Sequence, residues 1–199
     1  MHIPRYFAQD FLQRTAPGSL YRESWPSLFV GPAGTRSSLH IDAFGSNFWM
    51  ALFSGRKRWT LFTPDQVPAL EPEIPAHSFD PVFGVQNEAA WRARLGAATP
   101  MECVLEPGDL LFVPAGCPHT VTNLEPTVAL SANFVDTSNF DLVCRELEAE
   151  ALMQPGGRAS ELLAQFRDPC FDREMVLTAS ADVDVPYAAF KRSGDDVVS

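Results

Sequence analysis

Two runs of short apolar segments, each broken by glycine and proline turns, constrain the fold of this chain more than any other feature. Short apolar segments bounded by turn residues are typical of β-strands. Because so many of them follow one another, the sequence predicts a mainly β domain, either a sandwich or a closed barrel. The first run covers residues 27–31, 38–42, 47–54 and 57–64, and the second covers 101–106, 110–116, 119–124 and 127–135.

Beyond residue 135 the apolar pattern changes to the period of an α-helix. In "NFDLVCRELEAEALM" (139–153), apolar residues lie on one side of the predicted helix and glutamates on the other. A second C-terminal helix is predicted to begin at a Ser160 cap. We therefore divide the chain into a β core, residues 1–136, and a C-terminal helical extension, residues 137–199. Shorter helices are predicted near 8–14 and over 87–96.

The overall composition argues against several classes of protein. A formal charge of -10 disfavours generic binding to nucleic-acid backbones, which demands a basic face, but it is compatible with a basic protein substrate. No stretch approaches the roughly 18 to 20 apolar residues of a membrane span, and the first residues hold no apolar signal segment. The four cysteines form no CxxC pair and are interpreted as thiols, which favours a reducing compartment, nuclear or cytoplasmic.

Two histidines and one aspartate in the predicted strands are candidate metal ligands. His40 and Asp42 are two residues apart, so on a strand their side chains share a face. Such a pair can be surface decoration, an ion pair or two metal ligands, and an isolated His-x-Asp is most often not a metal site. His119 begins a strand of the second run, and strands distant in sequence line the same cavity of a closed barrel. Two imidazoles and one carboxylate on one side of a metal suit non-haem Fe(II) oxygenases.

Three further polar residues favour a ligand-binding interior. Lys57 lies between Gly55 and the apolar "WTLF", and a buried ammonium there would require an anionic partner such as a dicarboxylate. In a solvated turn the same lysine would require none. In "VALSANFV" (128–135), Ser131 and Asn133 share one face of an otherwise apolar strand, which indicates a polar cavity lining.

Three segments resemble the JmjC-domain oxygenases, over roughly residues 3–140. The likeness is strongest to the small branch that contains a lysyl hydroxylase and arginine demethylase once called phosphatidylserine receptor. The resemblance implies a cupin-like, jelly-roll double-stranded β-helix that binds Fe(II) and oxidises 2-oxoglutarate to succinate and carbon dioxide while a substrate is hydroxylated. The segments are "IPRYFAQDFLQ", "SSLHIDAFGSNFWMALFSGRKRWTLFTP" and "EPGDLLFVPAGCPHTVTNLEPTVALSANFV".

Carried over residue by residue, the resemblance implies roles for seven positions. His40, Asp42 and His119 match the iron ligands of the family. The cosubstrate residues are Lys57, which matches the lysine that pairs with the distal carboxylate of 2-oxoglutarate, Ser37, which matches a threonine bound to that carboxylate, and Ser131 and Asn133, which match polar pocket residues.

Two departures from the family pattern affect the cosubstrate pocket and the sheet. Met50 stands where the most similar relatives have an asparagine facing the cosubstrate, so one polar contact is lost. Relatives also carry a segment before "IPRYF" that supplies a cosubstrate-binding tyrosine and the first barrel strands. We therefore expect the first strands to be missing or those contacts to be replaced, and an uncovered sheet edge would favour a homo-oligomer.

The sequence thus predicts an Fe(II)- and 2-oxoglutarate-dependent dioxygenase that uses O2 to hydroxylate, or to demethylate by hydroxylation, a side chain of a protein or peptide substrate. One alternative is a cupin shell that binds a ligand or peptide with little turnover, which Met50 would favour. A second alternative is a histone or arginine demethylase proper, although the sequence has no reader domain, zinc-binding cysteine cluster or basic patch to favour it.

Overall fold

The computed structural model describes residues 2–3, 5–7, 9–23, 26–74, 82–83, 98–173 and 185–186. The chain forms two compact units, which we call the helical unit (Met1–Trp25 with Phe134–Ser199) and the β unit (Pro26–Asn133). Residues 1–25 therefore group with the C-terminal helices, and the domain division predicted at residue 136 stays a prediction. The helix predicted over 87–96 lies outside the described residues.

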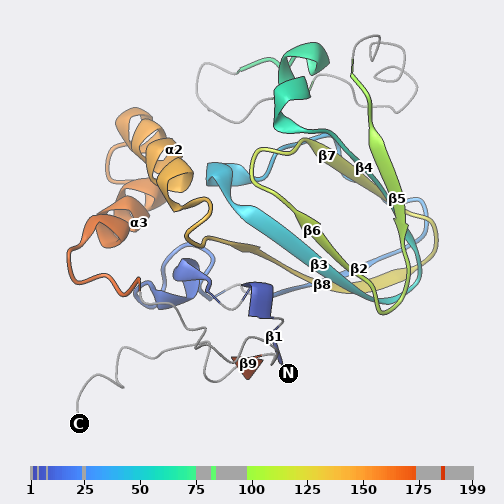
Figure 1. The fold of residues 1–199 in the computed structure, drawn as a ribbon, viewed down its shortest axis with the longest axis horizontal. Helices are drawn as coiled ribbons and strands as arrows, with labels where there is room; N and C mark the ends of the chain where they lie inside the picture. The colour runs from blue at the N-terminus through green and yellow to red at the C-terminus, as the bar shows by residue number, and fades with distance from the viewer. Residues whose placement is uncertain are drawn as a thin grey trace. The chain divides into compact units, whose positions relative to one another are not determined.

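The β unit contains two sheets that enclose an apolar core (Figure 1). Alternate side chains of both sheets point inward, and Phe48, Trp59 and Ala129 are among the residues buried between them. The strands of the first sheet, in order, are β2 (Ser27–Gly31), β8 (Thr127–Phe134), β3 (Asn47–Ser54) and β6 (Leu110–Val113). Those of the second are β5 (Met101–Leu105), β4 (Lys57–Leu61) and β7 (His119–Asn123).

A further strand position in the second sheet is taken by residues 36–40, which run antiparallel beside β7. Arg36 forms a bridge pair with Thr122, and His40 forms one with His119. Four steps along the chain separate the two pairs on this segment but only three on β7, so the segment carries one extra residue, a β-bulge. The continuous strand predicted over 38–42 is therefore wrong, because the bulge interrupts the ladder there.

Each sheet thus has four strand positions, as expected for a double-sheet jelly roll of the cupin type. The prediction that the first strands are missing is wrong for the β-helix itself, because β2 and the 36–40 segment occupy those positions. The strand predicted over 57–64 ends early, at Leu61, because Pro64 begins the 3-10 helix η4 (Pro64–Leu70).

The turn between β3 and β4 depends on a glycine. Gly55 has a φ of +78°, a conformation that L side chains rarely adopt. A Cβ at this position would also collide with the carbonyl group of Pro126. Only glycine therefore fits this turn, which sets the start of β4 and the position of Lys57.

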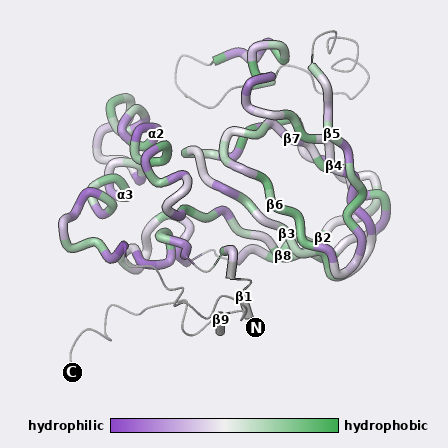
Figure 2. Tube along the Cα trace, viewed as in Figure 1, coloured by the Kyte–Doolittle hydropathy of each residue, from purple (hydrophilic) through white to green (hydrophobic). Residues whose placement is uncertain are grey.

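Where it is described, the helical unit contains two α-helices, 3-10 helices near the N-terminus and a short strand pair. The helix predicted from the apolar period is confirmed as α2, and Figure 2 shows hydrophobic and hydrophilic residues alternating along it. The second helix begins after its N-cap Gly157, so the predicted Ser160 cap is wrong. Within the described ranges, no helix has the length and apolar character needed to cross a membrane. The elements are η1 (Arg5–Phe7), η2 (Phe11–Arg14), α2 (Phe140–Met153), α3 (Arg158–Arg167), and β1 (His2–Ile3) paired with β9 (Val185–Pro186).

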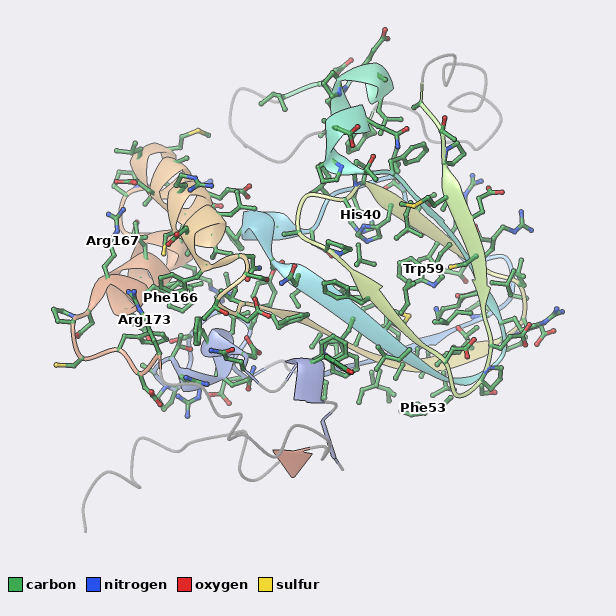
Figure 3. All side chains as sticks on the ribbon, viewed as in Figure 1. His40, Phe53, Trp59, Phe166, Arg167 and Arg173 are labelled. Atoms are coloured by element: carbon green, nitrogen blue, oxygen red, sulfur yellow. The ribbon has the colours of Figure 1, made fainter. Side chains whose placement is uncertain are left out.

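Aromatic rings pack these helices together. Phe11, in the 3-10 helix where the sequence predicts a short helix near 8–14, lies edge-on to Phe140 with ring centroids 5.4 Å apart. Phe140 in turn contacts Phe166 of α3 at 5.2 Å, and the Arg173 guanidinium lies 4.3 Å from the Phe140 ring centroid (Figure 3). Edge-on and cation–π geometries of this kind stabilise packing beyond the area that they bury.

Asp10 is a buried carboxyl group at the start of η2. Its Oδ1 accepts hydrogen bonds from the backbone N–H groups of Leu12 and Val135, both at 3.0 Å. Its Oδ2 has no hydrogen-bond partner among the described residues. Burial raises the pKa of Asp10 to about 7, although the backbone donors oppose the rise. This carboxyl group therefore couples the stability of the helical unit to pH.

Candidate metal centre

The structure brings together the three side chains that the sequence predicts as metal ligands. His40, Asp42 and His119 each offer one ligand atom, and these atoms lie within 4.8 Å of one another. The two Asp42 carboxylate oxygens each lie 3.9 Å from an imidazole, Oδ1 from Nε2 of His40 and Oδ2 from Nε2 of His119. This is the one group of three or more His, Cys, Asp or Glu side chains, among the residues described, that could hold a metal ion.

Alternation along the bulged segment explains how two of the ligands are positioned. Leu39 and Ile41 pack into an apolar cluster that includes Phe62, and this packing anchors the segment. His40 and Asp42, at the alternate positions, are thereby presented together. The pairing of His40 with His119 across the ladder brings the third ligand alongside, with imidazole centroids 4.3 Å apart.

Backbone carbonyl groups orient both imidazoles. Nδ1 of His40 lies 2.8 Å from the Ser38 carbonyl oxygen, and Nδ1 of His119 lies 3.0 Å from that of Cys117. Because a carbonyl oxygen can only accept, Nδ1 carries the proton in the neutral form of each imidazole, and in that form the lone pair is on Nε2. The two lone pairs are the donors that a metal ion requires, held by partners typical of metal-binding histidines.

The environment keeps His119 neutral and shields it on one side. His119 is 2% exposed, and this burial lowers its pKa, more than the nearby Asp42 carboxylate raises it. The rings of Phe48 and Trp59 lie 6.2 Å and 5.7 Å from the His119 ring. The side chain of His40 is 39% exposed, so the centre is accessible on the His40 side.

The Asp42 carboxylate makes no capping hydrogen bond to the helix that follows it. Asp42 is the N-cap of the 3-10 helix η3 (Ala43–Gly45), but its side chain makes no capping hydrogen bond. The next turn is strained, because Phe44 has a φ of 58° and is not a glycine. The chain thus turns sharply after Asp42 and leaves the carboxylate beside the imidazoles.

Lys57 lies inside the β unit, as the sequence predicts. It is 4% exposed, and its Nζ donates a 2.7 Å hydrogen bond to Oδ1 of Asn123, its cross-strand neighbour on β7. Burial lowers the pKa of Lys57, and no ion pair with a carboxylate is seen in the part of the chain that the structure describes. A buried ammonium group with one amide partner is costly, so this site favours an anionic ligand.

The sequence reasoning missed two residues of this region, Asn123, which faces Lys57, and Trp59, which lies between Lys57 and the level of His119. Asn123 shares the face of His119 on β7, because the two residues are four positions apart, and this spacing could have identified it. Trp59 pairs with Val121 midway along the same stretch, which is roughly 13 Å long at about 3.4 Å per residue. The Trp59 ring lies between the two sheets (Figure 3), and its buried Nε1 has no hydrogen-bond partner among the described residues.

The other predicted cosubstrate residues lie on β8 (Ser131 and Asn133) and beside β7 (Ser37), and their roles stay predictions. Ser131 is buried on the inner side of β8, and Nδ2 of Asn133 donates to Oγ of Ser46 at 3.0 Å. The Ser37 hydroxyl accepts a 3.1 Å hydrogen bond from the backbone N–H of Val121. Met50 is buried in the apolar core of the β unit.

The amino-acid sequence of this chain is similar to those of known cupin-like proteins. The cupin-like domain family matches residues 5–140. Relatives include the lysine-specific demethylase JMJ21 of Arabidopsis thaliana, 32% identical over 151 residues (73% of this chain and 16% of the relative). The human 2-oxoglutarate and iron-dependent oxygenase JMJD4 is 32% identical, over 74% of this chain and 36% of the relative. The Caenorhabditis elegans bifunctional arginine demethylase and lysyl-hydroxylase psr-1 is 30% identical, over 71% of this chain and 36% of the relative. The chain spans little more than a third of these relatives, or less.

Proposed function

Because this chain belongs to the cupin-like, JmjC-type family, we propose that it is an Fe(II)- and 2-oxoglutarate-dependent dioxygenase. The observation that supports this function most directly is the cluster of His40, Asp42 and His119. Both imidazoles present a lone pair, and the centre is accessible on the His40 side. An oxygenase needs both properties, because its metal must bind firmly and still be reached by a substrate.

Iron(II) fits this set of donor atoms. Donors on the same side of one ion, each about 2.0–2.2 Å from it, lie about 3 Å apart. Each Asp42 oxygen lies 3.9 Å from an imidazole nitrogen, and the three ligand atoms lie within 4.8 Å of one another, so the side chains would have to move closer together to bind one ion. Two imidazoles and one carboxylate on one side of an ion leave its other positions open, as non-haem Fe(II) oxygenases require. When bound, the iron would supply the activation of O2 for hydroxylation, coupled to oxidation of 2-oxoglutarate to succinate and carbon dioxide.

We assign 2-oxoglutarate to the stretch between His119 and Lys57. The Lys57 ammonium has three N–H donors and makes one described hydrogen bond, to Asn123, so donors remain for a carboxylate. Lys57 would bind and orient the distal carboxylate, and Asn123 would hold the ammonium group in place. The buried Trp59 Nε1–H is a further donor within the same stretch. The low exposure of all three residues excludes water and strengthens these contacts.

We propose that the substrate is a basic side chain of a protein or peptide. The names of JMJ21 and psr-1 describe activities on lysine or arginine residues. The formal charge of -10 on this chain supports attraction of such a substrate. Hydroxylation of an N-methyl carbon gives a hemiaminal, N–CH2OH, whose C–N bond then breaks to leave N–H and formaldehyde, so demethylation requires no change in the residues at the centre.

A second candidate function is a binding module that holds 2-oxoglutarate or a peptide with little turnover. The observation that favours it is Met50, which is buried in the apolar core where the family resemblance predicts a polar asparagine. The loss of one polar contact weakens cosubstrate binding without disturbing the three candidate ligands.

Succinate formation distinguishes the two candidates. The purified chain is loaded with Fe(II) under nitrogen and then mixed with O2, 2-oxoglutarate and peptides rich in lysine or arginine. For an enzyme we expect succinate in the wild type and in the control Asp65→Ala, which removes an exposed carboxylate of η4, and none in Asp42→Ala. Binding of Fe(II) and 2-oxoglutarate with no succinate from any peptide would instead identify a binding module.

A further inference from the structure

The turn at the end of β2, residues 31–35, holds a buried amide of the β unit. This amide belongs to Asn123 on β7, which is 6% exposed. The backbone N–H of Asn123 donates to the carbonyl oxygen of Thr35, and its own carbonyl oxygen accepts from the N–H of Gly34, both at 2.8 Å. Its side-chain Nδ2 donates to the carbonyl oxygen of Pro32 at 3.3 Å. The 31–35 turn therefore binds Asn123 through both its backbone and its side chain.

Opposite chemistry on its two sides fixes the orientation of this amide. The Pro32 carbonyl oxygen can only accept a hydrogen bond, whereas the Lys57 ammonium, 2.7 Å from Oδ1 of Asn123, can only donate. A flipped amide would face its N–H groups toward the ammonium and its oxygen toward the carbonyl. Both contacts would be unfavourable, and the burial of Asn123 leaves little water to compensate for them. Oδ1 therefore points at Lys57 before any ligand binds.

Gly31 leaves the room that this amide needs. A Cβ at position 31 would lie 2.7 Å from Nδ2 of Asn123, closer than real Cβ contacts come. The next nearest atom, Oγ1 of Thr35, would lie at 3.9 Å, which is an ordinary contact. The φ of Gly31 lies outside the left-handed region, so its backbone would accept an alanine. An alanine at position 31 would therefore displace the Asn123 amide and little else.

The Lys57 ammonium depends on Asn123 for its position. Within the described part of the chain, Nζ of Lys57 makes one hydrogen bond, to Asn123, and the cross-strand neighbour of Lys57 on β5 is the apolar Leu105. A lysine side chain has many rotamers, and fixing them costs conformational entropy. Because a fixed amide already holds this ammonium, part of that cost arises during folding and not during ligand binding.

We propose that the 31–35 turn makes Asn123 a positioning residue, which holds the Lys57 ammonium ready for the distal carboxylate of 2-oxoglutarate. This inference rests on the proposed function and extends it to a segment outside the stretch assigned to the cosubstrate. The turn acts on Asn123, Asn123 acts on Lys57, and Lys57 binds the carboxylate. A change in the turn therefore alters the affinity for the cosubstrate through two intervening side chains and leaves the candidate metal ligands in place.

Calorimetric titration of the Fe(II)-loaded chain with 2-oxoglutarate under nitrogen tests the step from Asn123 to Lys57. Asn123→Ala should weaken this affinity roughly tenfold and leave the affinity for Fe(II) unchanged, because the ammonium loses its one described partner. In a Lys57→Met background the same substitution should change the affinity by less than about twofold, because no ammonium remains to be positioned. Thr122→Ala is the control, since its side chain lies on the opposite face of β7, and it should bind like the wild type. Wild-type affinity in Asn123→Ala, or an equal fall in both backgrounds, would overturn the proposal.

Thermal unfolding of the Fe(II)-loaded chain without cosubstrate tests the step from the turn to Asn123. Gly31→Ala should lower the unfolding midpoint by roughly 4–8 °C, because the displaced amide loses a hydrogen bond. In an Asn123→Ala background it should lower the midpoint by less than half as much, because the amide that a Cβ would meet is gone. Equal losses in both backgrounds would overturn the role of the turn. A wild type that binds no 2-oxoglutarate would instead refute the proposed function, and with it the role of Asn123, whatever the unfolding midpoints are.

Discussion

Lys57→Met is the substitution that most directly tests how the β unit binds an anion. Methionine keeps the length and flexibility of the lysine side chain but removes the ammonium group. The structure shows Nζ in one hydrogen bond, to Oδ1 of Asn123, at 4% exposure of the residue. A carboxylate bound here would therefore form a charge-assisted hydrogen bond that little water can screen.

The magnitude of the effect follows from the energy of such a bond. Hydrogen bonds to charged groups contribute about 1.5–3 kcal/mol, so the affinity for 2-oxoglutarate should fall roughly ten- to a hundredfold. Affinity for Fe(II) should change little, because Lys57 lies four residue steps along the ladder from the level of His119. The stability of the free protein should fall by less than the binding energy, since loss of a buried charge offsets loss of the Asn123 contact.

Calorimetric titration of the Fe(II)-loaded protein with 2-oxoglutarate under nitrogen measures this affinity without turnover. Lys57→Arg, which keeps the charge, should recover part of the binding. Arg58→Met removes a neighbouring charge that is exposed on the opposite side of β4, and it should bind like the wild type. If Lys57→Met binds 2-oxoglutarate as tightly as the wild type, the ammonium group has no part in the cosubstrate site and our assignment of the interior is wrong.

Three further predictions concern the metal centre and the two units. His119→Ala should lose Fe(II) binding without unfolding, measured as anaerobic iron content, and wild-type iron content would refute the ligand set. Because the pKa of Asp10 in the folded state is about 7, above its ordinary value of 3.8, the folded state retains this proton more strongly. Stability should therefore fall as pH rises from about 4 to 7, by at most about 4 kcal/mol. Asp10→Asn should abolish this slope in urea titrations at pH 5 and pH 8, and a wild type with no slope would contradict the burial argument. Gly55→Ala should destabilise the chain by more than about 2 kcal/mol in thermal unfolding, because a Cβ there meets the Pro126 carbonyl. The control Gly34→Ala has a similar φ of +81° but open space around it, and it should cost about 1 kcal/mol. Equal losses of stability in the two variants would show that the Pro126 contact has no effect.

The strands and the proposed ligands could be predicted because both depend on local patterns. Period-two alternation and turn residues identify most strands to within a few residues, since each inward side chain must be apolar to fill the core. The spacing of His40 and Asp42 also predicts correctly that their side chains lie together, because alternate residues share a face even where the ladder is interrupted. The jelly roll then brings His119 beside them, and the order of the strands alone implies that contact.

Features that depend on contacts between distant segments could not be predicted in the same way. The bulge before His40 results from its register with β7, which no local pattern encodes. The amide of Asn123 becomes relevant only because β4 places Lys57 opposite it. Helix α3 begins after the N-cap Gly157 although Ser160 is a better intrinsic cap, so the preceding turn and not the cap propensity decides where it starts. Residues 1–25 group with the C-terminal helices through contacts such as Phe11 with Phe140.

The bulge between Arg36 and His40 gives the stretch before the first candidate ligand one residue more than the facing stretch of β7. A deletion of one codon there, for example that of Ser38, would leave three steps on each strand, so Arg36 would still face Thr122 and His40 would still face His119. A deletion of Ile41 would have the opposite effect, because His40 and Asp42 would become neighbours in the chain, and neighbouring residues on a strand point to opposite faces. A gene could thus tolerate the loss of one codon on one side of His40 and lose the candidate metal centre by the loss of one codon on the other side, with every histidine and aspartate still encoded in both cases.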